Sequence, residues 1–414
     1  MIDLRIGEFT DSFLPIVDGV GRVVLAYCEH LGKRDNEVYA IAPMADTGYR
    51  GRYNFELIDF LSAELPGGLQ WREGIPSADP HYLARMKNVE LDIVHSHSPF
   101  ISGYSAMRYS LRHKVPMVST FHSKYYDDFY KVTQSKTVSE LGVKAILEYY
   151  DHCDEVWAVS SSTADVLRDY GYKGSIFVVE NGSDTLPKES QGDPDEIKQL
   201  FGLSDDPVLL FVGQMNWKKN ILLILEAAAK LRRNGEKFQL LLVGQGPNSN
   251  EIQDKVNDLG IDDITKLPGH ITSVKELDGV YRASDIFVFP SLYDNAPMVV
   301  REAARAFTPP ILARGSSSAE IVEDGVNGRL CEDDADDLAR VIHEMLSDRD
   351  ALKAMGEKAS ETIPVPWGGI IDRVEERYRY LIDHHDPVPS RLEEIRSYLK
   401  KLNPVDILLS DDQK

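Results

Sequence analysis

The stretch DIFVFPSLYDNAPMVVREAA, residues 285–304, decides the fold of the surrounding chain. Its apolar run Ile286–Phe289 predicts a short buried strand of a parallel sheet. A polar turn follows, and Pro297 precedes a helical pattern at 298–307, in a position where proline is tolerated. Asp294 is therefore expected on the loop at the carboxyl end of a strand, and Glu302 about a turn and a half into the helix. Both carboxylates can point into one crevice and suit a polyhydroxylated ligand.

The same alternation of strand and helix patterns extends in both directions. Strand patterns occur at 4–9, 38–42, 93–95, 117–121, 155–159 and 176–179, and helical patterns at 20–31, 103–114, 138–151 and 160–170. After a polar segment at 184–206 the alternation restarts, with strands at 208–213, 240–244 and 265–268 and helices at 219–233, up to about 259, 336–346, 349–361 and 367–382. This order predicts an α/β fold of parallel sheets covered on both faces.

Length and composition narrow the class. A chain of 414 residues exceeds one ordinary core and predicts two domains. The net charge of −21 argues against a nucleic-acid partner. No apolar run reaches the roughly 18 residues of a membrane span, and a strand pattern begins at once, so no signal peptide is expected. The unevenly spread cysteines Cys28, Cys153 and Cys331 favour a reducing, cytoplasmic setting.

Residues 293–303 (YDNAPMVVREA), followed by 320–328 (EIVEDGVNG), resemble the nucleotide-sugar site of retaining glycosyltransferases of family 4. That family has the GT-B fold, in which two Rossmann-like β/α/β domains face each other across a cleft. The family pattern is a glutamate, seven residues and a second glutamate; here Asp294 stands first and Glu302 second. The resemblance implies that Asp294 holds hydroxyls of the transferred sugar and Glu302 the ribose. It implies no cofactor and no bound metal.

The resemblance also implies a division of the chain. Residues 1–186 are expected to form the N-terminal, acceptor-side domain, 187–206 the linker and 207–365 the C-terminal domain that binds the nucleotide sugar. Residues 366–385 are expected to form a closing helix that returns to the first domain. Residues 386–414 lie beyond the shared pattern as a C-terminal extension with a short amphipathic helix at 390–402.

Two loops after expected strands carry candidate donor-binding residues. In 213–220 (GQMNWKKN), Lys219 occupies the family's diphosphate-binding lysine position, but Gln214 stands where the family usually has arginine. Gln214 can donate hydrogen bonds but supplies no charge, and Lys218 or Arg314 could supply the missing cation. In the loop after the first strand, Gly19 precedes a helix and would let the backbone approach an anion.

A third loop, 314–320 (RGSSSAE), is rich in small residues, and the backbone N–H groups of Ser316, Ser317 and Ser318 could cradle a phosphate or the sugar. A plain serine N-cap is the alternative. His122, at the end of an expected strand, resembles the family's sugar-facing histidine. His95 and His97 share one face of a strand, but no third metal ligand stands at a convincing spacing.

One stretch of the expected acceptor-side domain is basic, although the chain as a whole is acidic. Residues 101–147 contain seven basic and three acidic residues, a net charge of +4, with aromatic residues interleaved. This pattern indicates either solvated helix faces around a core or a surface that touches anionic lipid headgroups. Within it, 121–128 (FHSKYYDD) resembles bacterial glycolipid synthases of the family.

Together with these observations, the resemblance implies a cytoplasmic, metal-independent retaining hexosyltransferase, located either free or peripherally on the inner face of the membrane. Its partners would be a UDP-, GDP- or ADP-linked sugar donor and a lipid-linked or glycan acceptor. Two alternatives remain open. One is a non-catalytic nucleotide-sugar-binding protein of the same fold, suggested by Gln214 and Asp294. The other is a sugar-nucleotide epimerase or a phosphorylase on the same architecture.

Overall fold

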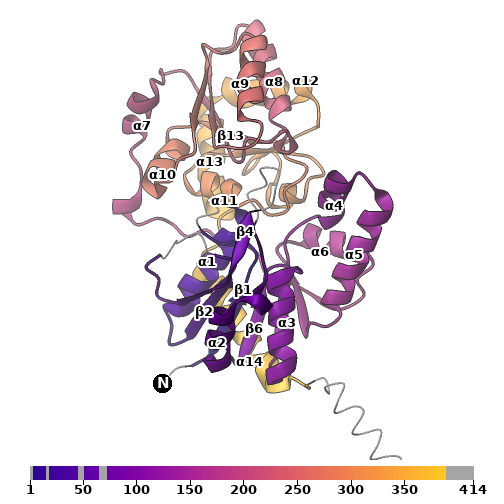
Figure 1. Cartoon of the computed structure of the whole chain (residues 1–414). Coiled ribbons are helices and arrows are strands. Elements are labelled where there is room, and N and C mark those ends of the chain that lie inside the picture. Colours follow the sequence, from indigo (N-terminus) through magenta and orange to yellow (C-terminus); the bar gives the residue numbers. More distant parts are fainter. Residues whose placement is uncertain (1–2, 15–17, 45–50, 65–71, 388–414) are drawn as a thin grey trace, which may run out of the picture.

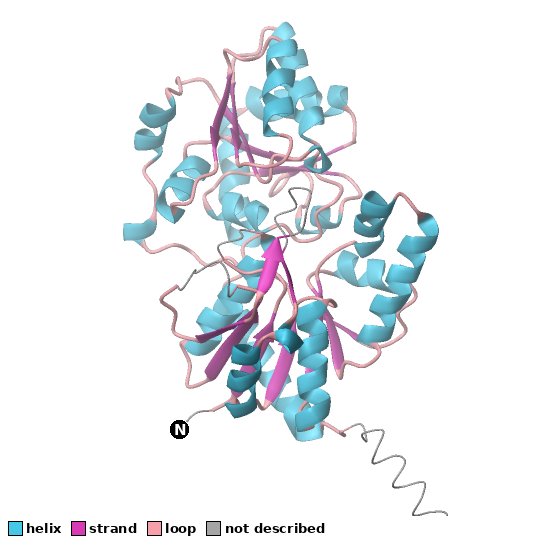
Figure 2. Cartoon of the chain, viewed as in Figure 1, coloured by secondary structure: helices cyan, strands magenta, loops and turns pink. Residues whose placement is uncertain are grey.

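The computed structural model describes residues 3–14, 18–44, 51–64 and 72–387, which form two α/β domains stacked along the long axis of the molecule (Figure 1). Each domain has a parallel sheet with helices around it (Figure 2). The expected α/β class is confirmed. The amphipathic pattern at 390–402 lies outside the described residues.

The first domain is built on a seven-stranded parallel sheet. In spatial order its strands are β3 (Glu56–Asp59), β2 (Glu37–Ala42), β1 (Arg5–Phe9), β6 (Ile93–Ser96), β7 (Met117–Phe121), β8 (Glu155–Ala158) and β9 (Ile176–Val178). Its helices are α1 (Gly19–Gly32), α2 (Pro80–Asn88), α3 (Ile101–His113), α4 (Tyr125–Thr133), α5 (Lys136–Tyr150) and α6 (Ser161–Asp169), with a small hairpin β4 (Ser62–Glu64) and β5 (Arg72–Gly74) and the short helix η2 (Pro76–Ala78). Two separate apolar clusters pack in this domain.

The second domain is built on a six-stranded parallel sheet and one continuous apolar core. Its strands are β12 (Thr265–Gly269), β11 (Gln239–Val243), β10 (Val208–Val212), β13 (Ile286–Phe289), β14 (Pro310–Ala313) and β15 (Arg329–Cys331). Its helices are α7 (Pro194–Phe201), α8 (Ile221–Arg233), α9 (Ser249–Asp258), α10 (Val274–Arg282), α11 (Met298–Arg305), α12 (Ala335–Ser347) and α13 (Arg349–Thr362), with the short helices η3 (Lys188–Ser190), η4 (Trp217–Lys219) and η5 (Ser317–Ile321).

The last described helix, α14 (Trp367–His384), packs in the first domain although it follows the second in sequence (Figure 1). Trp367 at its start packs edge-on against Tyr27 of α1 and stacks on His30, with ring centroids 5.7 and 6.0 Å apart. A Cβ added at Gly182 would lie 2.3 Å from the Trp367 ring. Helix α14 therefore completes an apolar cluster of the first domain that also contains residues of β1 and α1.

Strand order fixes where a ligand can bind. The order of connection reverses between β1 and β6 in the first sheet and between β10 and β13 in the second. In open parallel sheets, ligands bind at the carboxyl ends of the strands beside such a reversal. The loops after β10 and β13 contain Lys219 and Asp294, and the loop after β1 leads to Gly19.

The segment 187–206, expected as a linker, contains helix α7, and its Ile197 is buried in the second core. The segment is polar and contains prolines, so no helix was expected there. Pro194 is compatible with a helix because it lies in the first helical turn, where it does not disrupt hydrogen bonding. Strand β3, the β4–β5 hairpin and helix α4 also had no counterpart among the expected elements. All are short, so their periodicity gives a weak signal.

Candidate active site

Lys219 and Asp294 meet at the reversal point of the second sheet. The Lys219 Nζ donates to Asp294 Oδ1 at 2.5 Å, and the Ser291 hydroxyl donates to Asp294 Oδ2 at 2.6 Å. Both charged side chains keep a small exposed fraction, 16% for Lys219 and 18% for Asp294. The structure thus brings together the residues expected at the diphosphate and at the sugar, and pairs them with each other.

The loop that carries Asp294 also contacts the first domain. The Tyr293 hydroxyl donates to Asp128 Oδ1 of α4 at 2.6 Å, and the Asn295 side-chain amide donates to the backbone carbonyl of His122 at 2.7 Å. Lys124 donates to the carbonyl of Leu292 at 3.1 Å. Residues 290–297 therefore lie between the domains, and a ligand bound there would touch both.

Glu302 is buried, with 4% of its surface exposed, and it is bound on both carboxylate oxygens. Arg22 of α1 forms an ion pair with Oε1, and the Tyr281 hydroxyl donates to Oε2 at 3.0 Å. The neighbouring carboxylate raises the pKa of Arg22 above its ordinary value, against the opposing effect of burial. Glu302 thus lies where the first domain meets α11, in contact with a cation from the opposite domain.

The serine loop is packed more tightly than a free phosphate cradle. Ser316, Ser317 and Ser318 are all buried, and the Ser316 hydroxyl bonds the carbonyl of Ala313 at 2.7 Å. The Ser316 amide donates to the same carbonyl at 3.1 Å. Its N–H is therefore already used, and the cradle expected here reduces to the amides of Ser317 and Ser318 at the start of η5. Close by in sequence, Glu320 accepts from the amide of Ser162 in the first domain at 2.9 Å.

Gly19 and Gln214 are exposed at the ends of their loops. Gly19 is the first residue of α1, where Asp18 caps the helix by accepting from the Gly21 amide at 2.7 Å. A Cβ at Gly19 would meet no described atom within 4 Å, whereas one at Gly21 would lie 3.2 Å from the Ser12 carbonyl. Among the described atoms, a Cβ would therefore be tolerated at Gly19, whereas Gly21 is closely packed.

Of the two cations considered as substitutes for the family's arginine, only Lys218 lies near Asp294. Lys218 pairs with Asp128 at 3.2 Å and lies 4.4 Å from the Tyr293 ring centroid. Arg314 is tied to Asp324 at 2.9 Å and to Glu332 at 3.0 Å within its own domain.

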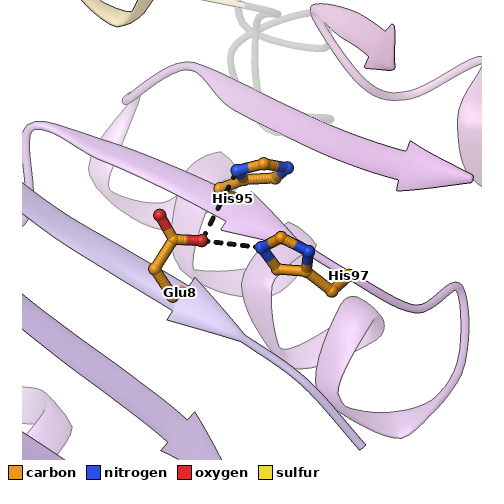
Figure 3. Close-up of side chains that lie close together, drawn as sticks. All are labelled: Glu8, His95 and His97. Atoms are coloured by element: carbon orange, nitrogen blue, oxygen red, sulfur yellow. Dashed lines mark hydrogen bonds and ion pairs between the residues drawn. The ribbon is translucent and has the colours of Figure 1, made fainter. Parts of the chain in front are cut away.

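The three histidines near the first sheet form one hydrogen-bonded group with Glu8 of β1. His97 Nε2 lies 2.8 Å from Glu8 Oε2, and His97 Nδ1 lies 3.1 Å from His122 Nε2. His95 Nδ1 lies 3.4 Å from Glu8 Oε2 (Figure 3). Parallel pairing sets Glu8 opposite His95, so one carboxylate and two imidazoles converge at a spacing that a metal ion could bridge, although no third ligand was expected from the sequence spacing.

A metal is nevertheless not required to satisfy these ligands. His95 already bonds Tyr378 through Nδ1 at 2.5 Å and Thr120 through Nε2 at 2.7 Å. Both nitrogens of His97 have protein partners, and the Tyr378 hydroxyl donates to Glu8 Oε1 at 3.1 Å. Protein hydrogen bonds alone therefore account for the arrangement.

Sequence reasoning missed Arg22, Asp128 and Glu8. Glu8 could have been noticed, because it places an acidic side chain within the short strand RIGEF, whose last four residues are all buried. Arg22 follows Gly19 and Gly21, and only the glycines of this loop suggested a binding role from the sequence. Asp128 lies on helix α4, which had not been anticipated, and its partner Lys218 is 90 residues away in the chain. No local pattern contains that contact.

The two parallel-sheet domains have the arrangement of glycosyltransferases of the GT-B type. Residues 17–185 match the model of Glycosyltransferase Family 4, and residues 193–362 match that of Glycosyl transferases group 1. The two models together span most of the chain. The chain belongs to the family-4 glycosyltransferases.

Known relatives and structures agree with this assignment. The alpha-monoglucosyldiacylglycerol synthase of Streptococcus pneumoniae is 24% identical over 91% of this chain and 85% of the relative. The GDP-mannose-dependent alpha-mannosyltransferase of Corynebacterium glutamicum is 25% identical over 93% of this chain and 89% of the relative. HepE of Anabaena, solved in complex with UDP and glucose, shares the fold with a TM-score of 0.74 at 16% identity, over 91% of this chain and 100% of HepE.

Among the described residues, none of the helices combines the length and hydrophobicity that a membrane crossing requires.

Proposed function

We propose that this protein is a retaining, metal-independent glycosyltransferase that moves a hexose from a UDP-, GDP- or ADP-linked donor to a hydroxyl of a lipid-linked or glycan acceptor. The observation that carries the proposal is the 2.5 Å contact between Lys219 and Asp294 at the reversal point of the second sheet. A nucleotide sugar presents a diphosphate next to a polyol, and a lysine beside a carboxylate complements that pair of groups. The synthase and mannosyltransferase named above support the class of acceptor and donor.

In this proposal, Lys219 binds the diphosphate and stabilises the charge that develops as the nucleotide leaves. Asp294 accepts hydrogen bonds from sugar hydroxyls, and Glu302 accepts them from the ribose. The amides of Ser317 and Ser318 and the open backbone at Gly19 complete the binding surface. The acceptor hydroxyl attacks from the face that the nucleotide leaves, so the anomeric configuration is kept.

Charge balance favours Arg22 and Lys218 as additional donor-binding cations, because Gln214 contributes none. Both lie between the domains and both are held by carboxylates, Arg22 by Glu302 and Lys218 by Asp128. A nucleoside diphosphate carries more negative charge than a single carboxylate, so it can compete for both cations. Donor binding would then exchange contacts between the domains for contacts with phosphate.

The test is a thermal-shift screen of UDP-, GDP- and ADP-hexoses, followed by a transfer assay with the donor that stabilises the protein. Glu302→Gln is the informative variant, because it keeps an acceptor for Tyr281, whereas Glu302→Ala leaves Arg22 without its partner. We expect Glu302→Gln to weaken donor binding and the surface control Glu361→Gln to leave it unchanged. Unchanged donor binding in Glu302→Gln would refute this placement of the ribose.

The other functional classes give different outcomes in the same assays. A stabilising donor with no transfer to lipid or glycan indicates a binding protein. Conversion of the sugar while it remains on the nucleotide indicates an epimerase. Glycosyl release that depends on inorganic phosphate indicates a phosphorylase.

We further propose that helices α4 and α5 contact the lipid surface that carries the acceptor. Val132 at the end of α4 and Val138 and Leu141 at the start of α5 are exposed, at 68%, 46% and 59%. Lys131 and Lys136 flank them in the sequence and can pair with anionic headgroups. Of the aromatic residues in 101–147, Tyr109 and Tyr125 are buried in the core and do not contribute to this lipid-contacting surface.

Co-sedimentation with vesicles tests this surface. The wild type should bind anionic vesicles more strongly than neutral ones, and the double variant Val132→Ser, Leu141→Ser should bind both less. The matched control Leu61→Ser, Ile75→Ser removes two exposed apolar side chains elsewhere in the first domain. No binding of the wild type to either vesicle would remove the membrane proposal and leave the transferase proposal intact.

A further inference from the structure

The first sheet holds a carboxyl group at a position where a central parallel strand normally carries an apolar side chain. Glu8 of β1 has no exposed surface, and neither the diphosphate nor the sugar contacts proposed above use it. It does connect to the site through His97 and His122, in a line that leads from the core to the domain interface. The carbonyl of His122 accepts from Asn295 of the opposite domain, which places the outer end of this line at the proposed sugar site.

On one side of Glu8, the hydrogen bond from Tyr378 sets the direction of the bonds that continue from it. Tyr378 has a single hydroxyl proton, which it donates to Glu8 Oε1. His95 Nδ1 must then donate to the Tyr378 oxygen, and His95 Nε2 accepts from Thr120. With Oε1 accepting from Tyr378, the oxygen that gains or loses a proton is Oε2, which faces His97.

The other side of Glu8 has two self-consistent arrangements, because a neutral imidazole carries one N–H. When Glu8 is ionised, His97 Nε2–H donates to Oε2, His122 Nε2–H donates to His97 Nδ1, and Nδ1 of His122 is an acceptor. When Oε2 is protonated, each bond reverses and Nδ1 of His122 carries the proton. Within the described ranges, Nδ1 of His122 has no protein partner, so it is available to a ligand.

We propose that Glu8 is a positioning residue for glycosyl transfer: through His97 it decides whether His122 offers the sugar a hydrogen-bond donor or an acceptor. This inference rests on the proposed function, because it takes His122 to face the donor sugar. The conversion between the two forms is balanced by one proton. Water supplies it to Nδ1 of His122, the Nε2 proton of His122 passes to His97 Nδ1, and the Nε2 proton of His97 passes to Glu8 Oε2.

The surroundings favour Glu8 as the group that holds this proton. Burial raises the pKa of Glu8 to about 8, although the Tyr378 hydrogen bond opposes the shift. Burial lowers the pKa of His97 to about 3, and burial together with His97 lowers that of His122 well below its usual range. The titratable groups that face Glu8 or continue its hydrogen-bond line come from four other elements or the residues directly after them: Tyr27 and Cys28 of α1, His95 of β6 and His97 after it, His122 after β7, and Tyr378 of α14.

The experiment reads the histidine tautomers directly, in the full chain labelled with ¹⁵N-histidine, by NMR between pH 6 and 10. His122→Asn and His97→Asn assign the signals. In the wild type, the protonated nitrogen of His97 and of His122 should move from Nδ1 to Nε2 in one shared transition as the pH rises. In Glu8→Gln the side-chain amide donates to His97 Nε2, so both rings should stay Nδ1-protonated at every pH.

Two further variants keep the test decisive. Tyr378→Phe removes a hydrogen bond to the carboxylate and should move the shared transition to higher pH. Glu155→Gln changes another strand glutamate of the same sheet and should leave the wild-type pattern. The same His122 tautomer in wild type and Glu8→Gln across the range would overturn the proposal. Stoichiometric metal in the purified protein would also overturn it, because an ion bound to Glu8, His95 and His97 would replace the shared proton.

Kinetics separate this inference from the proposed function. The wild type should show a kcat that differs by roughly tenfold between its low-pH and high-pH plateaus. Glu8→Gln should hold the low-pH value throughout, with a donor KM within about twofold of the wild type. Transfer that is absent in the wild type defeats the proposed function and leaves the tautomer result standing. Wild-type transfer with identical pH profiles in both proteins defeats only the role of Glu8.

Discussion

Lys219 is paired with Asp294 in the structure, and we therefore expect substitutions of these two residues to change nucleotide affinity in opposite directions. Asp294→Asn removes the competing carboxylate, so a nucleoside diphosphate that lacks its sugar should bind the variant more tightly than the wild type. Lys219→Met removes the cation itself, so the same ligand should bind more weakly. The direction of each change follows from the single contact at 2.5 Å.

The size of each effect follows from the partial burial of the pair. An exposed ion pair contributes about 0–1 kcal/mol and a charge-assisted hydrogen bond about 1.5–3 kcal/mol. With 16% and 18% of the side chains exposed, about 1 kcal/mol for the Lys219–Asp294 contact is reasonable, equivalent to roughly fivefold tighter binding in Asp294→Asn. Loss of a charge-assisted contact to phosphate in Lys219→Met corresponds to roughly 10- to 150-fold weaker binding.

Titration calorimetry with UDP, GDP and ADP measures both effects on the full chain. Lys230→Met is the matched control, because Lys230 also pairs with an aspartate, Asp336, but on the surface of the second domain. Its affinity for the nucleotide should equal that of the wild type. Asp294→Asn should still lose transfer activity, since the sugar contact is gone. If both site variants bind the nucleotide within twofold of the wild type, Lys219 does not contact the diphosphate.

Three further outcomes are expected. Tyr293→Phe removes the hydrogen bond to Asp128 and should raise the rate of hydrogen exchange in residues 290–297; exchange equal to the wild type would mean that this contact does not hold the loop. Trp367→Ala should lower the free energy of unfolding by about 3–5 kcal/mol, measured by denaturant titration, because it empties the space between α14 and α1; a loss below about 1 kcal/mol would contradict that packing. The pKa of Glu8 is 4.5 in the unfolded chain and about 8 in the fold, so its protonation stabilises the fold fully below pH 4.5 and this contribution is lost as the pH rises towards about 8. The stability of Glu8→Gln relative to the wild type should therefore increase over that window, by up to about 5 kcal/mol. Parallel curves of unfolding free energy against pH for the two proteins would contradict this.

The strands and longer helices could be predicted from the sequence because their signals are local. Buried runs such as Ile286–Phe289 and Met117–Phe121 have the bounds that were expected. Helix α7 was missed because half of its eight side chains are polar and only Ile197 is buried. Periodicity says little over two turns when most of the helix faces water.

The site shows the same division between local and distant information. Lys219, Asp294 and His122 could be chosen because each ends a recognisable strand or opens a helix. Other contacts around the site could not be predicted, since Arg22 and Glu302 are 280 positions apart and Glu8 and Tyr378 are 370 apart. Such contacts depend on how two sheets and the returning helix α14 are placed in space, which no short pattern records. Glu8 alone left a local signal, as an acid within an apolar strand.

The most direct test of glycosyl transfer with retention follows the anomeric proton of the sugar by ¹H NMR while the purified protein acts on its stabilising nucleotide sugar and an acceptor. The account predicts that the α-anomeric signal of the donor is replaced by an α-anomeric signal of the product, at the rate at which nucleoside diphosphate appears. A β-anomeric product, or a donor that remains intact with every lipid and glycan acceptor, would contradict it.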